Sequence, residues 1–156
     1  MANRLTSAKL ESYYAALGRF VAAWADTETC LDLVVLASRP RRLFIQLSEK
    51  TRFIREVVAP MLSEALAKEA LRLMDGIDAI AETRHDFVHG GLISHTFKRS
   101  RLIVTLGRLV QPPRKPRRAP AKVTAVQLKT SAEKVRDLGD LLLDLTQAIL
   151  REQRHN

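Results

Sequence analysis

Apolar residues recur along the first third of the chain at spacings of three, four or seven positions. They are Leu10, Tyr13, Leu17, Phe20, Trp24, Leu31 and Val35. This spacing is typical of one long amphipathic helix with a single apolar stripe. Arg39-Pro40 ends the pattern, because the residue before a proline is disfavoured in helical geometry.

Two more helices are predicted before residue 90. One runs from about Ser48 to Ala59, where Pro60 marks a break. Its inward positions are Phe53, Ile54, Val57 and Val58. The next begins near Ser63 and is capped by Gly90-Gly91. Its apolar stripe comprises Leu66, Ala70, Leu73, Ile77, Ile80, Ala81, Phe87 and Val88.

The pattern changes to strand-like runs after the glycines. Leu92 to Phe97 and Arg101 to Val110 are predicted to form a β-hairpin around a Lys98-Arg99-Ser100 turn. Residues 111–122 hold four prolines and no large apolar group. They are therefore expected to form a mobile basic linker rather than a packed element.

The last helix is predicted to begin at Thr124 or at Thr130. A glutamine or glutamate follows each threonine three positions later, as in a capping box. The stripe of this helix is Leu128, Val135, Leu138, Leu142, Leu145 and Ile149. The pattern as a whole predicts an all-α, antiparallel (up-down) bundle of four main helices in one domain spanning residues 1–156. A short β-hairpin and a basic Pro-rich insertion, residues 92–122, precede the last helix.

Composition agrees with this fold and narrows the setting. Hydrophobic residues make up 46% of the chain and aromatic residues only 5%, a balance that favours helices. Cys30 is the single cysteine, so no intramolecular disulfide can form. The N-terminus lacks the apolar run of a signal peptide, and no run is long enough to span a membrane. We therefore expect a cytoplasmic protein without membrane segments.

The formal net charge of +9 is concentrated in one segment, which we call the basic strip. Between Phe87 and Ala132 there are ten basic residues and no Asp or Glu. The ten are Lys98, Arg99, Arg101, Arg108, Arg114, Lys115, Arg117, Arg118, Lys122 and Lys129. Such a strip attracts polyanions by releasing their counterions. The simpler interpretation is a solvated basic loop without a ligand.

Two charged residues occupy positions where the helical pattern expects apolar ones. Glu28 falls within the stripe of the first helix, and Arg84 falls at the centre of the stripe before residue 90. A buried charge without a partner is costly. The pattern therefore predicts that Glu28 and Arg84 pair across the two longest helices, which on its own could be a purely structural pair.

Reactive groups gather around Arg84. His85 and His89 border the face that Arg84 centres, whereas Asp86 points the opposite way. His89 lies in the last helical turn, where the helix dipole favours a protonated imidazole. A histidine beside a guanidinium suits reaction at a phosphodiester, because the histidine exchanges protons while the arginine holds the phosphate. Such chemistry requires no metal and no cofactor.

The segment from Glu82 to Gly90 resembles the motif of HEPN-domain proteins. That motif is an arginine, usually followed by a polar residue, with a histidine after a gap of four to six. Here Arg84 and His89 are separated by four residues, and His85 replaces the commoner asparagine. Trp24-Ala25-Asp26-Thr27-Glu28 in the long first helix adds to the resemblance, which covers roughly residues 5–91 and the last helix.

The resemblance implies a homodimer in which Arg84 and His89 of both protomers face one cleft. In active members such a cleft cleaves RNA without metal and leaves a cyclic phosphate on the upstream fragment. His89 would then act as acid or base, Arg84 as phosphate clamp, His85 as a supporting polar group and Glu28 as orienter. If the chain acts as a toxin or defence effector, an antitoxin or regulatory partner that masks the cleft is expected. Other members are inert as nucleases and serve as dimerising or binding modules.

Two further alternatives arise from the residues themselves. His85 and His89 have the spacing of zinc ligands on a helix, but Asp86 is shorter than the usual glutamate and faces away, and His95 is the only nearby third ligand. The other alternative is nucleic-acid binding through the basic strip without chemistry. It predicts salt-dependent binding that survives Arg84→Ala and is lost when residues 111–122 are deleted.

Overall fold

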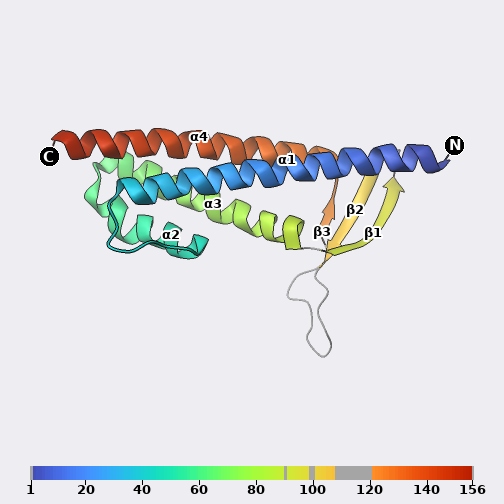
Figure 1. The fold of residues 1–156 in the computed structure, drawn as a ribbon, viewed down its shortest axis with the longest axis horizontal. Helices are drawn as coiled ribbons and strands as arrows, with labels where there is room; N and C mark the ends of the chain where they lie inside the picture. Colours follow the sequence, from blue (N-terminus) through green and yellow to red (C-terminus); the bar gives the residue numbers. More distant parts are fainter. Residues whose placement is uncertain (1, 90, 99–100, 108–120, 156) are drawn as a thin grey trace, which may run out of the picture. The chain divides into compact units, whose positions relative to one another are not determined.

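The computed structural model describes residues 2–89, 91–98, 101–107 and 121–155 (Figure 1). Its α-helices are α1 (Ala2–Ala37), α2 (Leu47–Phe53), α3 (Glu64–His89) and α4 (Ala125–His155). A π-helical turn η1 (Ile54–Val58) and a 3-10 turn η2 (Ala59–Met61) join α2 to α3, and the strands are β1 (Gly91–Lys98), β2 (Arg101–Gly107) and β3 (Ala121–Val123). The predicted mostly helical fold, with a hairpin before the last helix, is confirmed.

The three strands form one antiparallel sheet in the order β1-β2-β3. In the hairpin, Lys98 lies opposite Arg101, and a bulge interrupts the register between Leu92 and Ser94. The prediction that residues 111–122 contain no packed element is wrong at its end, because Ala121 and Lys122 pair with β2. Strand pairing satisfies backbone groups at the edge of β2 and requires no apolar side chain. Residues 108–120, which include most of the predicted linker, lie outside the described residues.

The chain divides into two compact units, which are described separately. The sheet unit comprises residues 1–22 and 82–133, and the helical unit comprises residues 23–81 and 134–156. Helices α1, α3 and α4 each contribute to both units. The expected single domain therefore stays a prediction.

The core of the sheet unit joins α1, the end of α3, the sheet and the start of α4. Its buried apolar side chains are Tyr13, Ala16, Phe20, Phe87, Leu102, Val104, Val123, Leu128 and Ala132. The rings of Phe20 and Phe87 meet edge to face, with centroids 5.1 Å apart. This contact attaches the last turns of α3 to α1.

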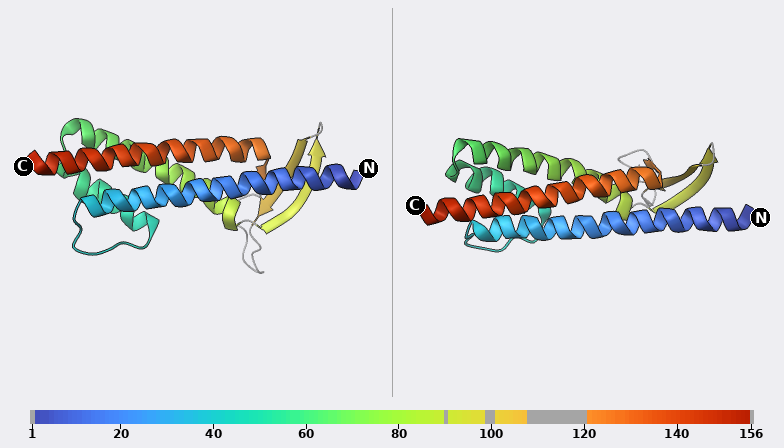
Figure 2. Two further views of the ribbon diagram at one scale, coloured as in Figure 1. Left: turned by 45° about the horizontal axis from the view of Figure 1, so that its top comes forward. Right: turned by 90° about the horizontal axis from the view of Figure 1, so that it is seen from above.

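In the helical unit, α3 runs antiparallel to α1 and α4, which run in the same direction as each other (Figure 2). Helices α1 and α4 pack closely. The hydroxyl of Thr27 lies 2.9 Å from the carbonyl oxygen of Ala23 and 2.8 Å from that of Val135. A Cβ atom at Gly139 would lie 3.1 Å from the Thr27 hydroxyl oxygen. Glycine at this position thus permits the close approach of the two helices.

The second predicted helix is interrupted by a change in helical geometry. Residues 54–58 form a π-helical turn between α2 and η2. Because a π turn holds more residues than an α turn, it rotates later side chains away from the expected face. Ile54 and Val58 are buried as predicted, but Val57 is 46% exposed, so its predicted inward position is wrong.

The predicted capping signal at the start of the last helix is confirmed. Thr124 precedes α4 and forms the predicted capping box. The backbone amide of Gln127 donates to the Thr124 hydroxyl at 3.2 Å, and the amide of Thr124 donates to the Gln127 side chain at 2.9 Å. After α1, Arg39 has a φ of 50°. Gly91 is the first residue of β1, and Gly90 lies outside the described residues, so the predicted glycine cap is not tested.

Within the described ranges, none of the helices has the length and apolar character needed to cross a membrane.

Candidate nucleic-acid site

The proposed motif lies at the end of α3, which continues to His89. Arg84 and His85 are half-buried, the Nε atom of Arg84 is buried, and both side chains already make interactions in the structure. The helix therefore carries Arg84, His85 and His89 on consecutive turns, as predicted. The side chains of Asp86, Val88 and His89 lie outside the described residues.

Phe87 determines which side of α3 faces the core of the sheet unit. It is 8% exposed and packs against Phe20. Arg84 precedes Phe87 by three residues, so both lie on the same side of the helix, about one turn apart. The half-burial of Arg84 agrees with the sequence-based expectation that its stem belongs to the core-facing stripe.

Glu28 is half-buried on α1 and belongs to the helical unit, whereas Arg84 belongs to the sheet unit. Within the helical unit, none of the described ion pairs includes Glu28. Its pairing with Arg84, and its role as orienter, stay predictions. Another acidic residue of α1, Asp32, forms an ion pair with the buried Lys50 of α2. Sequence reasoning missed this pair because no periodic signal marks a lysine that is buried on so short a helix.

The described part of the basic strip lies in the sheet unit together with Arg84. Lys98 and Arg101 face each other across the end of the hairpin, and both are exposed. Lys122 on β3 and Lys129 on α4 are also exposed. Like charges directly opposite each other on paired strands are destabilising, which an anionic ligand would relieve. Of the predicted RNA-binding residues, the following lie outside the described residues: Arg99, Arg108, Arg114, Lys115, Arg117 and Arg118.

Two other ionisable groups are poor candidates for catalysis at neutral pH. Burial, with Tyr14 nearby, raises the pKa of Tyr13 to about 12, so its phenol stays protonated. Burial also raises the pKa of the Cys30 thiol, with further contributions from Asp26 and Asp140. A thiol held in its protonated form is a weak nucleophile.

Among the side chains that the structure describes, no three His, Cys, Asp or Glu residues gather as metal ligands. The side chains of His89 and His95 are not part of that set. A zinc site through His85 and His89 is therefore not tested by the described residues.

No protein family model matches the chain, and neither the curated proteins nor the solved structures include a match.

Proposed function

We propose that this chain is a metal-independent endoribonuclease whose reacting groups are Arg84 and His89 at the end of α3. The observation that carries the proposal is the sequence of elements in the sheet unit. The helix that bears Arg84, His85 and His89 leads directly into a hairpin that bears the like-charged, exposed pair Lys98 and Arg101. Acid-base groups, a guanidinium and an anion-attracting surface thus occur in one unit.

The reaction that these groups suit is cleavage by the 2′-hydroxyl of RNA itself. The 2′-oxygen attacks the adjacent phosphorus and loses its proton to a base, while the 5′-oxygen of the next nucleotide leaves and takes up a proton. His89 exchanges one of these protons, and Arg84 holds the phosphate oxygens as charge develops on them. His85 is a supporting polar group, and a role of Glu28 as orienter stays a prediction from the sequence. The products are a 2′,3′-cyclic phosphate and a 5′-hydroxyl, so atoms balance without added water.

The proposal includes a second protomer and an RNA-gathering surface. Following the resemblance to HEPN-domain proteins, Arg84 and His89 of both protomers would face one shared cleft. The basic strip would concentrate RNA near it through phosphate contacts that weaken as salt is added. A toxin or defence role, with an antitoxin or regulatory partner that masks the cleft, belongs to the same proposal.

The direct test is cleavage of labelled RNA in the presence of EDTA. We expect wild-type protein to cut, and Arg84→Ala and His89→Ala each to lower the rate by at least a hundredfold. Arg72→Ala is a matched control, because Arg72 is an exposed arginine of the same helix that pairs with Glu69; it should cleave normally. If wild-type protein leaves RNA intact, or the variants cut at the wild-type rate, the enzymatic proposal is wrong.

A mixing experiment tests the shared cleft separately. If Arg84 of one protomer acts together with His89 of the other within the shared cleft, a mixture of Arg84→Ala and His89→Ala proteins contains hybrid dimers that keep one intact Arg84–His89 pair of the two. The mixture should then recover up to about a quarter of wild-type activity after subunit exchange. No recovery despite exchange would contradict a cleft shared in this way.

The second candidate function is RNA binding without chemistry, which the opposed Lys98 and Arg101 favour. It predicts that wild-type protein binds RNA with a steep salt dependence and does not cut it. Lys98→Ser with Arg101→Ser should then reduce the salt dependence of binding, because two phosphate contacts are removed. Under the nuclease proposal, the same variant raises KM more than it lowers kcat.

A further inference from the structure

Helix α4 carries a second stripe of residues on its outer side, in addition to the stripe in the core. The outer positions recur at spacings of four and three, and every one of them is exposed. They are Arg136, Asp140, Leu143, Gln147, Leu150 and Arg154. Spacings of four and three keep these positions on one side of the helix, and two of them, Leu143 and Leu150, are apolar. We call these six positions the outer stripe.

The outer stripe is not needed for the protein's own core. The core positions of this part of α4 are Val135, Leu142, Leu145 and Ile149, which are all buried. Leu143 and Leu150 remain 38% and 40% exposed and lie seven residues apart. Their apolar area is therefore available to another helix.

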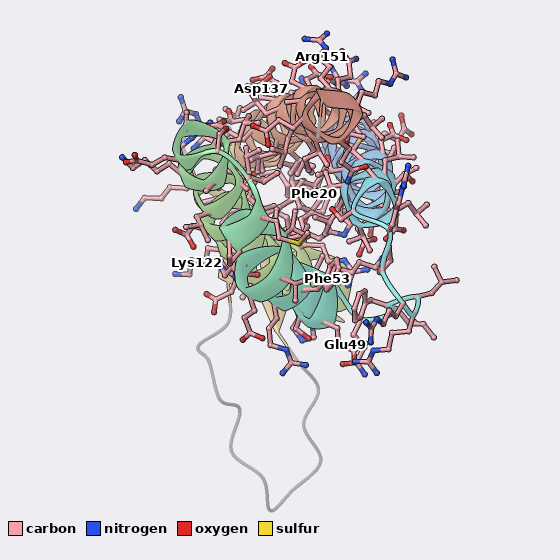
Figure 3. All side chains as sticks on the ribbon, turned by 90° about the vertical axis from the view of Figure 1, so that its left-hand side faces the viewer. Phe20, Glu49, Phe53, Lys122, Asp137 and Arg151 are labelled. Carbon is pink, nitrogen blue, oxygen red and sulfur yellow. The ribbon has the colours of Figure 1, made fainter. Side chains whose placement is uncertain are left out.

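Near the middle of the outer stripe, charges of opposite sign lie on the two sides of Gln147, whereas both of its end positions, Arg136 and Arg154, are basic. Asp140 and Asp144 lie before Gln147, and Arg151 and Arg154 lie after it. None of these four residues takes part in an ion pair among the described side chains. Like charges three or four residues apart on a helix repel each other. Figure 3 shows Arg151 on the outer side of α4, directed away from the protein.

This arrangement matches a second copy of the same helix, running in the opposite direction. In a two-fold antiparallel pair centred on Gln147, Leu143 lies near Leu150 of the second copy. In the same register, Asp140 lies near Arg154 of the second copy and Asp144 near Arg151 of the second copy. By two-fold symmetry each contact occurs twice. A parallel pair would instead place carboxylate on carboxylate and guanidinium on guanidinium.

Helix α1, which packs against α4, also carries exposed leucines. Gly139 of α4 lies close to Thr27 and Cys30 of α1, and the two helices run in the same direction (Figure 2). Leu33 follows Cys30 by three residues and Leu143 follows Gly139 by four, so both lie about one turn beyond this contact. Leu33 and Leu36 are 41% and 52% exposed.

We propose that the outer stripe of α4 is a homodimer interface, in which α4 packs antiparallel on α4 of a second copy with Gln147 at the two-fold axis. The interface lies within residues 136–154 of the helical unit, whereas Arg84 and His89 lie in the sheet unit. It is thus a different surface from the shared cleft of the proposed function. The smallest closed assembly that uses both surfaces is a tetramer, and one that uses α4 alone is a dimer.

Sedimentation analysis of the full chain tests the interface. Leu143→Asp with Leu150→Asp should halve the molar mass of the wild-type assembly. The control is Leu71→Asp on α3, a residue with a matching exposure of 39%, which should leave the mass unchanged. A monomeric wild type at about 100 μM, or an unchanged mass for the double variant, would overturn the proposal. Circular dichroism confirms that each variant stays helical.

Charge variants test whether the named residues face each other. Protein P carries Asp140→Arg and Asp144→Arg, and protein N carries Arg151→Asp and Arg154→Asp. Each alone should lose the interface, because like charges then meet, and an equimolar mixture should restore it. The protein with all four changes keeps the antiparallel complementarity and should assemble as wild type does. Failure of both the mixture and the fourfold variant to assemble would contradict the register.

Cross-linking then tests the axis. In a Cys30→Ala background, Gln147→Cys should form a disulfide-linked dimer under mild oxidation, because the two-fold axis brings the residue against itself. Asp137→Cys, which lies nearly three turns away on the same helix, should not. Equal cross-linking of the two variants would show that α4 does not pair in this register. Cross-linking at Gln147→Cys does not involve RNA. The α4 interface can therefore be confirmed or rejected whether or not the protein cleaves RNA.

Discussion

The ring of Phe20 meets the ring of Phe87 edge to face, with centroids 5.1 Å apart and planes inclined by 72°. Phe20 is fully buried and Phe87 is 8% exposed. Through this pair, the N-terminal half of α1 supports the turn of α3 that carries Arg84. The candidate site therefore depends on a hydrophobic contact within the sheet unit as well as on its charged residues.

Replacing Phe87 by alanine should lower the free energy of unfolding by about 3–5 kcal/mol, because a buried aromatic ring is lost and a cavity remains. Urea denaturation measures the change. Val126→Ala is the control, since Val126 is 67% exposed on α4 and should change stability by less than about 0.5 kcal/mol. A Phe87→Ala effect as small as that of Val126→Ala would show that the Phe20–Phe87 contact does not form.

Two glycines inside helices should respond to alanine in opposite directions. A Cβ atom at Gly18 meets nothing within 4 Å, so Gly18→Ala should stabilise the protein by about 0.5–1 kcal/mol through helix propensity. At Gly139 the added Cβ would lie 3.1 Å from the Thr27 hydroxyl, which two carbonyl contacts hold in place. Gly139→Ala should therefore destabilise by roughly 1–2 kcal/mol. Thermal unfolding of both variants checks this, and stabilisation by both would contradict the close packing of α1 and α4.

Because the phenol of Tyr13 is buried, we expect the folded protein to lose stability at high pH. Burial raises the pKa of its phenol from 10.0 to about 12 in the folded protein, so between these values the unfolded chain releases a proton that the folded protein retains. Stability associated with this group is fully present below pH 10 and decreases by on the order of 2 kcal/mol as the pH rises to 12. Urea denaturation across this range measures the loss.

The variant Tyr13→Phe isolates that contribution. It should remove this part of the alkaline destabilisation. At pH 7 it should leave stability unchanged or slightly higher, because the Tyr13 hydroxyl is buried without a hydrogen-bond partner among the described residues. An alkaline profile identical to that of wild type would show that another group causes the loss.

The helices could be predicted from the sequence because their apolar residues recur with clear periodicity. Within the first stripe, Tyr13, Phe20, Trp24, Leu31 and Val35 are buried as the pattern required, whereas Leu17 is half-buried. The Thr124 capping box marks the start of α4. The exposure of Val57 could not be predicted. The pattern assumes 3.6 residues per turn, and the π turn at residues 54–58 has more. Strand β3 was missed for a related reason. Its pairing depends on the backbone of β2, which composition does not reveal.

The candidate site could be predicted only in part. The α3 backbone places Arg84, His85 and His89 on adjoining turns, and the half-burial of Arg84 follows from its place in the apolar stripe. The pairing of Glu28 with Arg84 joins residues of different units, and a shared cleft requires a second copy, so one chain's periodicity cannot determine either. The buried Lys50 and its partner Asp32 depend on a tertiary contact that no local pattern marks.

We propose that His89 takes part in RNA cleavage without metal, and the chemical structure of the cut ends distinguishes this reaction from other kinds of cleavage. Purified protein is incubated with labelled RNA in EDTA, and the 3′ ends of the fragments are identified by mass spectrometry. The proposal predicts 2′,3′-cyclic phosphates with wild-type protein and none with a folded His89→Ala variant. Intact RNA with wild-type protein, or the same cyclic phosphates at the same rate with His89→Ala, would contradict it.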